Sequence, residues 1–285
     1  MVRGSCLCGD VVWEAAGDLH WMSHCHCSMC RKAHGSAFST FVAAPADGFR
    51  LVSGHERVAR YESSPGFLRP FCSRCGSVVV AADPAEERVF MPAGCLDDDP
   101  GVRPAAHIFV ASKALWHEIA GDLPRFDAYP PGVGAPEVAR EPEPVAREGA
   151  VGGSCLCGGV AYEVEGRLEA IYNCHCSRCR KARSAAHACN AFAEASRFRW
   201  VRGEGQLESF KVPEAKRFTS CFCRVCGSSL PRVDTTRGRA VIPAGTLDGD
   251  PGARERFHIF CGSKAPWYEI SDDLPQFEEY EPGRS

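Results

Sequence analysis

Three cysteines lie within six residues at two places in the chain. The segments are HCHCSMCRK (24–32) and NCHCSRCRK (173–181), and both follow the pattern Cys-x-Cys-x-x-Cys. Neighbouring cysteines two residues apart rarely reach disulfide geometry, whereas three close thiolates suit one side of a tetrahedral zinc site. We therefore predict a zinc site at each tri-cysteine motif. Its ligands are Cys25, Cys27 and Cys30 in the first motif, and Cys174, Cys176 and Cys179 in the second.

A second kind of cysteine pattern surrounds each tri-cysteine motif. A Cys-x-Cys pair precedes it and a Cys-x-x-Cys pair follows it, each with a glycine directly after the last cysteine. Glycine adopts the positive φ that a tight metal-binding turn requires, and four thiolates complete a structural zinc site. We predict two such Cys₄ sites, formed by Cys6, Cys8, Cys72 and Cys75, and by Cys155, Cys157, Cys223 and Cys226.

The tri-cysteine sites have no obvious fourth protein ligand once the Cys₄ sites are complete. Three protein ligands with an open position are typical of catalytic zinc, so an open site is one interpretation. A closed structural site is the other, with a nearby side chain as fourth ligand. The candidates are His24, His26 and His34 in the first motif, and His175, His187 and Cys189 in the second.

Basic residues follow the third cysteine of each motif. Zinc with three thiolates has a net charge of −1, which a neighbouring cation can offset. We therefore assign these basic residues to charge compensation and to cofactor binding. They are Arg31, Lys32, Arg180 and Lys181.

The motifs recur because the chain is one unit repeated in tandem. The offset between copies is 149 residues from the first pair through the tri-cysteine motif, and 151 from the Cys-x-x-Cys pair onward. Residues 131–150 are rich in Pro, Gly, Glu and Ala, a composition that favours an extended linker. We predict domains at residues 1–130 and 151–285.

Both copies have the pattern of small, mainly β domains. Short runs rich in β-branched and aromatic residues at 11–14, 37–43, 57–61, 77–81 and 160–163 are separated by Gly, Pro and Asp. No helical periodicity extends beyond a turn or two. Short helical or 3₁₀ turns are expected, for example around 96–100.

The composition is that of a globular protein. The formal net charge of −3 gives no electrostatic argument for binding nucleic acid or an anionic membrane. No apolar run approaches membrane-spanning length, and the first residues lack the apolar region of a signal peptide. We expect a cytoplasmic protein, where eighteen cysteines with these spacings favour metal over disulfides.

The other conspicuous residues have structural interpretations. Cys95, Cys221 and Cys261 lack a cysteine at the equivalent position and are expected to be core or loop residues. His107 and His258 lie in apolar segments, so a buried structural role is favoured over acid–base catalysis. The two tryptophans Trp116 and Trp267 are expected to anchor the C-terminal segments in the core.

Both copies resemble the glutathione-dependent formaldehyde-activating family, which includes centromere protein V. The shared signature is G-x-C-x-C-G, C-H-C-x-x-C-R-K, F-C-x-x-C-G, A-G-x-L-D, H-I-F with S-K and Trp, and D-L-P. It covers essentially the whole chain outside the linker. The resemblance implies two zinc-bearing β domains of the Mss4-like, or β-tent, type.

The same resemblance implies two zinc ions per domain, or four per chain, and glutathione as a substrate. The implied reaction is that of a carbon–sulfur lyase, in which glutathione adds to formaldehyde to give S-hydroxymethylglutathione. The partners would be a small thiol and an aldehyde, with neither nucleic acid nor membrane. The alternative is a non-catalytic zinc module that binds glutathione or another protein.

The two copies differ after the third cysteine. The first continues RKAHGSAF (31–38), close to the usual family sequence, whereas the second continues RKARSAAH (180–187) and then has Cys189. Our hypothesis is that the first copy keeps the typical pocket. The second would be altered in substrate, or its zinc would be closed by His187 or Cys189.

Overall fold

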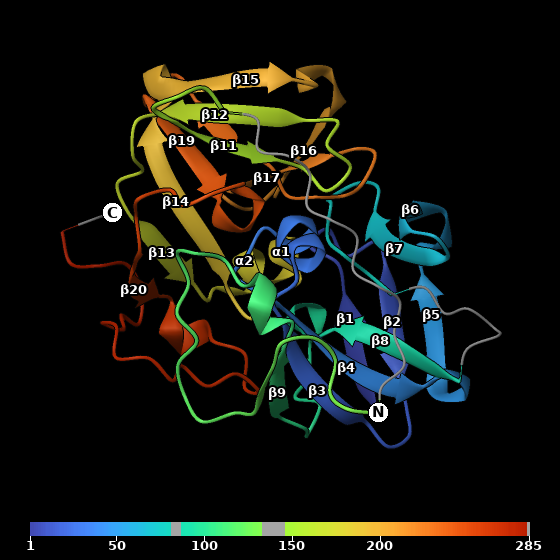
Figure 1. Cartoon of the computed structure of the whole chain (residues 1–285). Helices are drawn as coiled ribbons and strands as arrows, with labels where there is room; N and C mark the ends of the chain where they lie inside the picture. The colour runs from blue at the N-terminus through green and yellow to red at the C-terminus, as the bar shows by residue number, and fades with distance from the viewer. Residues whose placement is uncertain (81–86, 133–145, 284–285) are drawn as a thin grey trace.

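The computed structural model describes residues 1–80, 87–132 and 146–283, and strands dominate both repeats (Figure 1). The prediction of a mainly β fold is confirmed. Within the described residues the helical elements are two short α-helices and several 3₁₀ turns. None of these helices is long and apolar enough to cross a membrane.

The two repeats have nearly the same order of elements. The first comprises β1 (Val2–Ser5), β2 (Val12–Ala15), β3 (His20–Cys25), α1 (Ser28–His34), β4 (Ser39–Pro45), β5 (Phe49–Ser53), β6 (Val58–Ser64), β7 (Phe67–Cys72), β8 (Arg88–Pro92), β9 (Pro104–Ile108) and β10 (Arg125–Phe126). The second comprises β11 (Ala150–Ser154), β12 (Ala161–Glu165), β13 (Ile171–Cys174), α2 (Ser177–Arg183), β14 (Ala188–Glu194), β15 (Phe198–Arg202), β16 (Leu207–Lys211), β17 (Thr219–Cys223), β18 (Arg232–Asp234), β19 (Arg239–Pro243) and β20 (Glu255–Ile259).

Each repeat folds into a three-stranded sheet, a five-stranded sheet and a hairpin. In the first repeat the sheet orders are β1-β2-β5 and β10-β9-β3-β4-β8, and the hairpin is β6-β7. The second repeat has β11-β12-β15, β18-β19-β14-β13-β20 and the hairpin β16-β17. Most pairs are antiparallel, but β9 runs parallel to β3 and β20 runs parallel to β13. In each repeat this parallel pairing brings the histidine of the H-I-F motif beside the start of the tri-cysteine motif.

The expected strands at 11–14, 37–43, 57–61 and 160–163 are found as β2, β4, β6 and β12, with ends shifted by one to three residues. The expected strand at 77–81 is wrong for its described residues, which contain only an isolated bridge between Phe71 and Val78. The reason is that the metal-binding turn folds this segment back on β7, where the Val79 amide donates to the Pro70 carbonyl. The 3₁₀ turn expected near 96–100 lies earlier, as η3 (Ala93–Cys95).

The helices α1 and α2 lie side by side at the centre of the molecule, between the sheets of the two repeats (Figure 1). Each packs on a 3₁₀ turn of the other repeat: α1 on η7 (Ala244–Thr246) and α2 on η3. Reciprocal contacts also join the Cys-x-x-Cys-Gly turns, because Gly76 packs against the Phe222 ring and Gly227 against the Phe71 ring. The repeats therefore meet across an approximately twofold interface.

The buried apolar side chains of both repeats form one continuous cluster. It includes Trp13 and Trp116 from the first repeat and Tyr162 and Trp267 from the second, each at most 1% exposed. The prediction that Trp116 and Trp267 anchor the core is confirmed. The division into two separate domains stays a prediction, since the hydrophobic core itself is shared.

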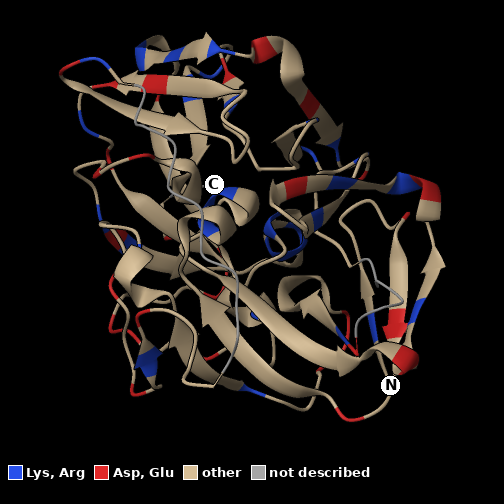
Figure 2. Cartoon of the chain, turned by 45° about the vertical axis from the view of Figure 1, so that its right-hand side comes forward, with Lys and Arg blue, Asp and Glu red and all other residues tan. Residues whose placement is uncertain are grey.

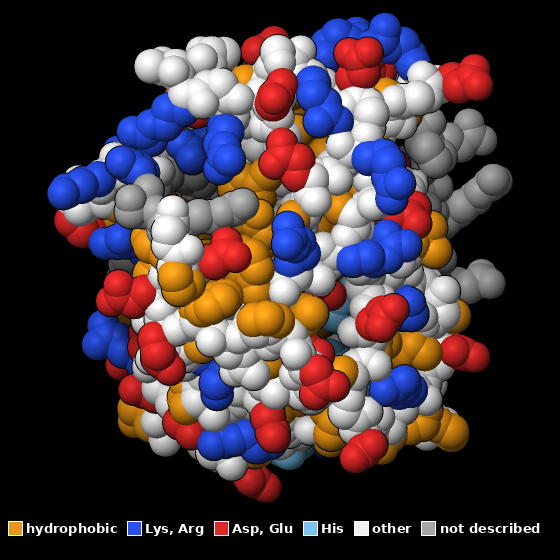
Figure 3. Space-filling model, turned by 90° about the vertical axis from the view of Figure 1, so that its left-hand side faces the viewer, with side chains coloured by type: hydrophobic (Ala, Val, Ile, Leu, Met, Phe, Trp, Pro, Cys, Tyr) orange, Lys and Arg blue, Asp and Glu red, His pale blue; other side chains and the backbone are white. Residues whose placement is uncertain are grey.

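Charged side chains of both signs are spread over the surface. Figure 3 shows Lys and Arg interspersed with Asp and Glu on one face, around a group of hydrophobic side chains near its middle. That face therefore has no extended surface of a single charge sign.

Candidate metal centres

The eight cysteines predicted to form Cys₄ sites come together in two groups of four. In the first repeat all four Sγ atoms lie within 4.8 Å of one another, with Cys6 and Cys8 3.4 Å apart and Cys8 and Cys72 3.7 Å apart. The second repeat matches, at 3.4 Å for Cys155 and Cys157 and 3.8 Å for Cys157 and Cys223.

These spacings fit a tetrahedral metal ion. Four sulfurs bonded to zinc at about 2.3 Å would lie about 3.8 Å from one another. A disulfide would bring two sulfurs to about 2.05 Å, and all eighteen cysteines are free. The residues therefore fit zinc as the Cys-x-Cys and Cys-x-x-Cys spacings predicted.

The tri-cysteine motifs lie where a strand ends and a helix begins. Cys25 ends β3, and Cys27 is the N-cap of α1, its sulfur accepting from the Cys30 amide at 3.4 Å. The three sulfurs lie within 4.8 Å of one another, and so do those of Cys174, Cys176 and Cys179. Sequence reasoning predicted these clusters but missed both helices, whose capping residue is a cysteine rather than the usual Ser, Thr, Asp or Asn.

The candidate fourth ligands are engaged elsewhere. Among the described residues, no histidine, carboxylate or further cysteine has its ligand atom close to all three sulfurs of either motif. In the first repeat His24 bonds Thr40, His26 bonds His107 and His34 bonds the Arg183 carbonyl. In the second, His175 bonds His258, and the Cys189 sulfur lies 3.4 Å from His187 Nδ1. This arrangement supports an open fourth position in both sites.

The surroundings of the first tri-cysteine site combine a cation with aromatic rings. Arg69, on β7, places Nη1 3.7 Å from the Cys30 sulfur. Burial disfavours the charged guanidinium, but the Cys30 and Cys27 thiolates more than offset this and raise the pKa of Arg69. Burial and the nearby Cys25 and Cys30 thiolates also raise the pKa of Tyr129 to about 12, so its ring lies close to the site as a neutral phenol.

The second tri-cysteine site is more exposed. Cys176 and Cys179 are partly exposed, whereas all three cysteines of the first site are buried. Hydrogen bonds with Cys174 and Cys179 lower the pKa of Cys176 to about 3, so one thiolate is available in this cluster at neutral pH. At the position of Arg69 this repeat has Ser220.

The four basic residues assigned to cofactor binding lie on the two central helices, where Lys and Arg positions are coloured blue on the ribbon of Figure 2. Lys32 is buried and contacts Asp248 and Ser154 of the other repeat. Lys181 makes the corresponding contacts with Asp97 and Ser5. Burial lowers the pKa of Arg180, and Arg31 is buried as well. The two lysines therefore join the repeats, and their role toward a bound thiol stays a prediction.

Arg69 is the site residue that sequence reasoning missed. It lies 39 residues beyond Cys30 and has no basic counterpart in the second repeat, so no repeated motif marked it. The only signal available was a single arginine in a strand two residues before a repeated Phe-Cys pair.

A cluster of buried histidines lies between the two tri-cysteine motifs. His258 bonds His175 and Asp272, His107 bonds His26, and His117 pairs with Glu255 of the other repeat at 2.8 Å. Burial lowers the pKa of His107 to about 4 and that of His187 to about 3. Both are neutral at pH 7, which matches the structural role favoured for His107.

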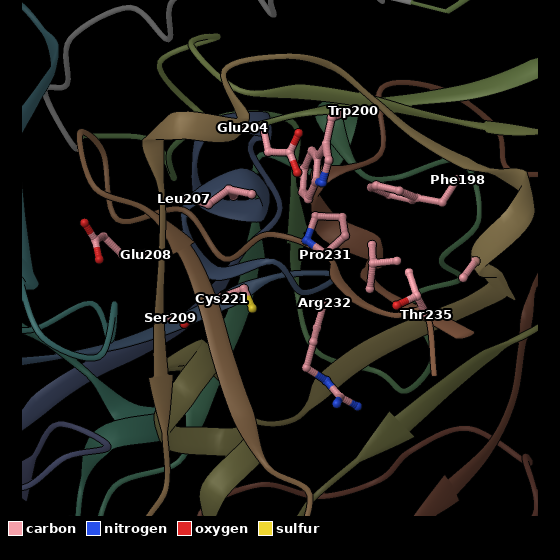
Figure 4. A pocket seen from close by; sticks show the side chains of 12 residues that line it. Phe198, Trp200, Glu204, Leu207, Glu208, Ser209, Cys221, Pro231, Arg232 and Thr235 are labelled. Atoms are coloured by element: carbon pink, nitrogen blue, oxygen red, sulfur yellow. The ribbon is translucent and has the colours of Figure 1, made fainter. Parts of the chain in front are cut away.

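A cavity of about 510 Å³ opens in the second repeat (Figure 4), and no cysteine of the four clusters lines it. Phe198, Trp200 and Leu207 form apolar walls, and Arg232 and Cys221 also line it. Cys221 is thus a half-buried residue at a cavity wall. Burial raises the pKa of its thiol, which makes it a weak nucleophile.

This fold and these centres define a β protein with one four-cysteine and one three-cysteine candidate metal site in each repeat. The family model described as "Glutathione-dependent formaldehyde-activating enzyme" matches the chain twice, over residues 1–112 and 150–263. The chain belongs to this family, which confirms the resemblance seen in the sequence.

Individual relatives match one repeat's length or less. A Halomonas elongata protein named "Putative glutathione-dependent formaldehyde-activating enzyme" is 33% identical over 129 residues, 42% of this chain and 81% of that protein. An uncharacterized lyase of Schizosaccharomyces pombe is 34% identical over 80 residues, 28% of this chain and 56% of that protein. A crystal structure of a Rhodobacter sphaeroides protein is 30% identical, covering 35% of this chain and 89% of that one, with a TM-score of 0.29.

Proposed function

We propose that the protein is a zinc-dependent carbon–sulfur lyase that joins a thiol such as glutathione to formaldehyde or another small aldehyde. The reaction takes place at a tri-cysteine site. The observation that carries the proposal is a cluster of three cysteine sulfurs with no fourth protein ligand among the described residues, in a chain of this family. The Cys₄ sites stabilise the fold around it.

The residues of the first repeat supply the setting for this chemistry. Cys25, Cys27 and Cys30 would hold zinc, which when bound favours the thiolate form of a thiol at its open position. The thiolate sulfur attacks the aldehyde carbon, the carbonyl π electrons move to oxygen, and that oxygen takes a proton from solvent. The product is a hemithioacetal, which with formaldehyde is an S-hydroxymethyl adduct of the thiol. The addition changes no oxidation state overall, so no electron acceptor is required.

One neighbour of the cluster, Arg69, favours the anionic sulfur. The Arg69 guanidinium compensates negative charge beside Cys30, and the rings of Phe109 and Tyr129 pack edge to face at 4.7 Å near the cysteines. A dry, cation-bearing site strengthens the interaction between a thiolate and its surroundings.

We also propose that the protein works in a reducing compartment such as the cytoplasm. All eighteen cysteines are free, and the proposed sites need fourteen of them as thiolates. An oxidising compartment would favour disulfides among cysteines this close together.

Metal analysis combined with calorimetric titration of glutathione tests the proposal. We expect four zinc ions per chain and saturable thiol binding, followed by adduct formation when formaldehyde is added. Cys27→Ala should lose one zinc ion and the thiol binding of the first repeat. Cys261→Ala is the matched control, because this half-buried cysteine belongs to neither kind of cluster.

The outcomes separate the proposed enzyme from its alternative. Four zinc ions with thiol binding but no acceleration of adduct formation would indicate a non-catalytic glutathione-binding module. Two zinc ions per chain would contradict the two-site interpretation of each repeat.

A further inference from the structure

The two tri-cysteine sites differ in the cation that contacts a cysteine sulfur from the hairpin beside the site. In the first repeat Arg69 is held by three contacts: Nη1 to the Cys30 sulfur at 3.7 Å, Nε to Ser63 Oγ at 2.9 Å, and the guanidinium over the Phe67 ring at 5.0 Å. These contacts fix both the position and the orientation of the cation toward the sulfur cluster.

Arg69 has no carboxylate partner among the described residues. No Asp or Glu oxygen there lies within ion-pair distance of its guanidinium, and its hydrogen bonds go to a hydroxyl and a sulfur. Its positive charge therefore faces the three cysteines rather than a surface ion pair. A guanidinium has five N–H donors, so several remain for an incoming anion.

The second repeat lacks this cation. Ser220 stands at the position of Arg69, and its buried Oγ has no hydrogen-bond partner. In the part of the chain that the structure describes, no Lys or Arg nitrogen forms a hydrogen bond with the sulfurs of Cys174, Cys176 or Cys179. Arg178, the residue before Cys179, is exposed. Arg183 is close enough to interact electrostatically with Cys179, but its guanidinium bonds Asn190 rather than a sulfur.

The difference matters for the charge of the fourth ligand. Zinc with three thiolates has a net charge of −1, and a thiolate at the open position makes it −2. A guanidinium beside the cluster returns the total to −1 and stabilises the four-thiolate state, whereas a serine does not.

We propose that Arg69 determines where thiols bind. It makes the first tri-cysteine site the thiolate-binding site of the protein, and the second site binds the same thiols more weakly because, among the described residues, no guanidinium contacts its sulfurs. This inference rests on the proposed function and names the site and the residue that perform its binding step.

Single-site variants of the full chain test the inference by calorimetric thiol titration. Cys176→Ala leaves the first site alone and Cys27→Ala leaves the second. We expect the first site to bind 2-mercaptoethanol and glutathione at least about tenfold more tightly than the second, as one compensating charge nearby would produce. Adding Arg69→Gln to Cys176→Ala should remove this advantage, and Arg69→Lys should restore part of it.

The reciprocal substitution is the matched control. Adding Ser220→Arg to Cys27→Ala should raise the thiol affinity of the second site. If Arg69→Gln does not fold, this gain in affinity is by itself the test of the inference. Zinc content and the sulfur-to-metal absorption of the cobalt-substituted proteins verify in each variant that the tri-cysteine centre is still formed.

Three results would overturn the inference while leaving the proposed function standing. They are equal thiol affinity of the two sites, unchanged affinity in Arg69→Gln, and a loss confined to thiols that carry a carboxylate, which would make Arg69 a carboxylate-binding residue instead. Metal-loaded protein that binds no thiol at either site would overturn the proposed function and this inference with it.

Discussion

Equivalent residues of the two repeats occupy different environments, and two lysines illustrate this at the residue scale. Lys32 and Asp248 form an ion pair whose side chains are each only 3% exposed. The corresponding pair, Lys181 and Asp97, is 20% and 32% exposed. Both pairs join the tri-cysteine helix of one repeat to the L-D motif of the other, so this part of the family signature holds the repeats together.

Removing one partner of the buried pair should be strongly destabilising. Asp248→Asn leaves the Lys32 ammonium buried without a counter-charge, which typically costs about 3–5 kcal/mol. We expect the free energy of unfolding, measured by urea denaturation of the zinc-loaded protein, to fall by that order.

The corresponding ion pair, Lys181 with Asp97, provides the control for this substitution. Asp97→Asn changes the same type of ion pair in a more exposed position, where a smaller loss of about 1 kcal/mol is expected. Equal losses in the two variants would show that burial does not determine the strength of the Lys32 interaction.

The cysteines were predictable from sequence at this scale, and the lysine partners were not. Metal ligands come in short spacings that reveal their chemistry, such as Cys25, Cys27 and Cys30. Lys32 and Asp248 are 216 residues apart and belong to different repeats, so only the packing of the repeats shows that they meet. The sequence therefore suggested a substrate role for a side chain that the structure places in an interface.

At the scale of elements, the close packing of helices on 3₁₀ turns determines which residues fit. A Cβ atom on Gly245 in η7 would lie 2.4 Å from the backbone nitrogen and oxygen of Ser36, just after α1. The family motif A-G-x-L-D thus needs its glycine because another repeat's backbone occupies the space.

Gly245→Ala should therefore separate α1 from η7. Neither contact atom belongs to a flexible side chain, so we expect a loss of at least about 1–3 kcal/mol in the free energy of unfolding, as for other overpacked sites. Gly205→Ala is the control, since a Cβ there meets no atom within 4 Å. Thermal and urea unfolding of both variants should show a large effect for the first and a small one for the second.

Strands were predictable to within a few residues where β-branched and aromatic residues gather between Gly, Pro and Asp. The strand expected at 11–14 is an example, since it is found as β2 (Val12–Ala15) with its apolar residues buried and Glu14 half-buried. The helices were not predictable, because α1 and α2 have only seven residues each and begin at a metal-binding cysteine. Their stability comes from packing between the repeats rather than from an amphipathic pattern of their own.

At the scale of the whole molecule, the buried histidines should make stability depend on pH. The unfolded chain protonates histidine near pH 6.5, but His107 and His187 have folded-state pKa values of about 4 and about 3. Between pH 6.5 and these folded-state pKa values, the unfolded chain binds more protons than the folded protein does. Stability is therefore fully present above pH 6.5 and is lost as the pH falls toward 4.

His187→Phe isolates one contribution to this acid loss. Phenylalanine occupies the equivalent position in the first repeat, Phe38. We expect the free energy of unfolding of the variant to decline less steeply between pH 6 and 4, by about 1 kcal/mol per pH unit. Acid also weakens thiolate–metal bonds in both proteins, so the difference between their slopes is the informative quantity. Parallel slopes would contradict the assignment.

The shared core leads to the last prediction, that the two halves of the chain need each other to fold. Trp13 and Tyr162, from different repeats, belong to one buried cluster, and the central helices contact the opposite repeat. A single half would expose this apolar surface together with Lys32 or its partner Asp248. We expect segments 1–132 and 146–285, co-expressed as two chains with a tag on one, to copurify as a stoichiometric pair that unfolds in a single transition.

Each segment expressed alone should be largely insoluble or should pair with itself less stably than with the other. The asymmetric contact between His117 and Glu255 gives the reason, because a pair of identical halves would lack it: Tyr268 and Pro104 occupy the equivalent positions. His117→Tyr in the co-expressed pair should therefore weaken copurification by removing the hydrogen bond between His117 Nδ1 and the buried Glu255 carboxylate. Independent, monomeric and equally stable halves would instead establish the two-domain organisation that the sequence alone predicts.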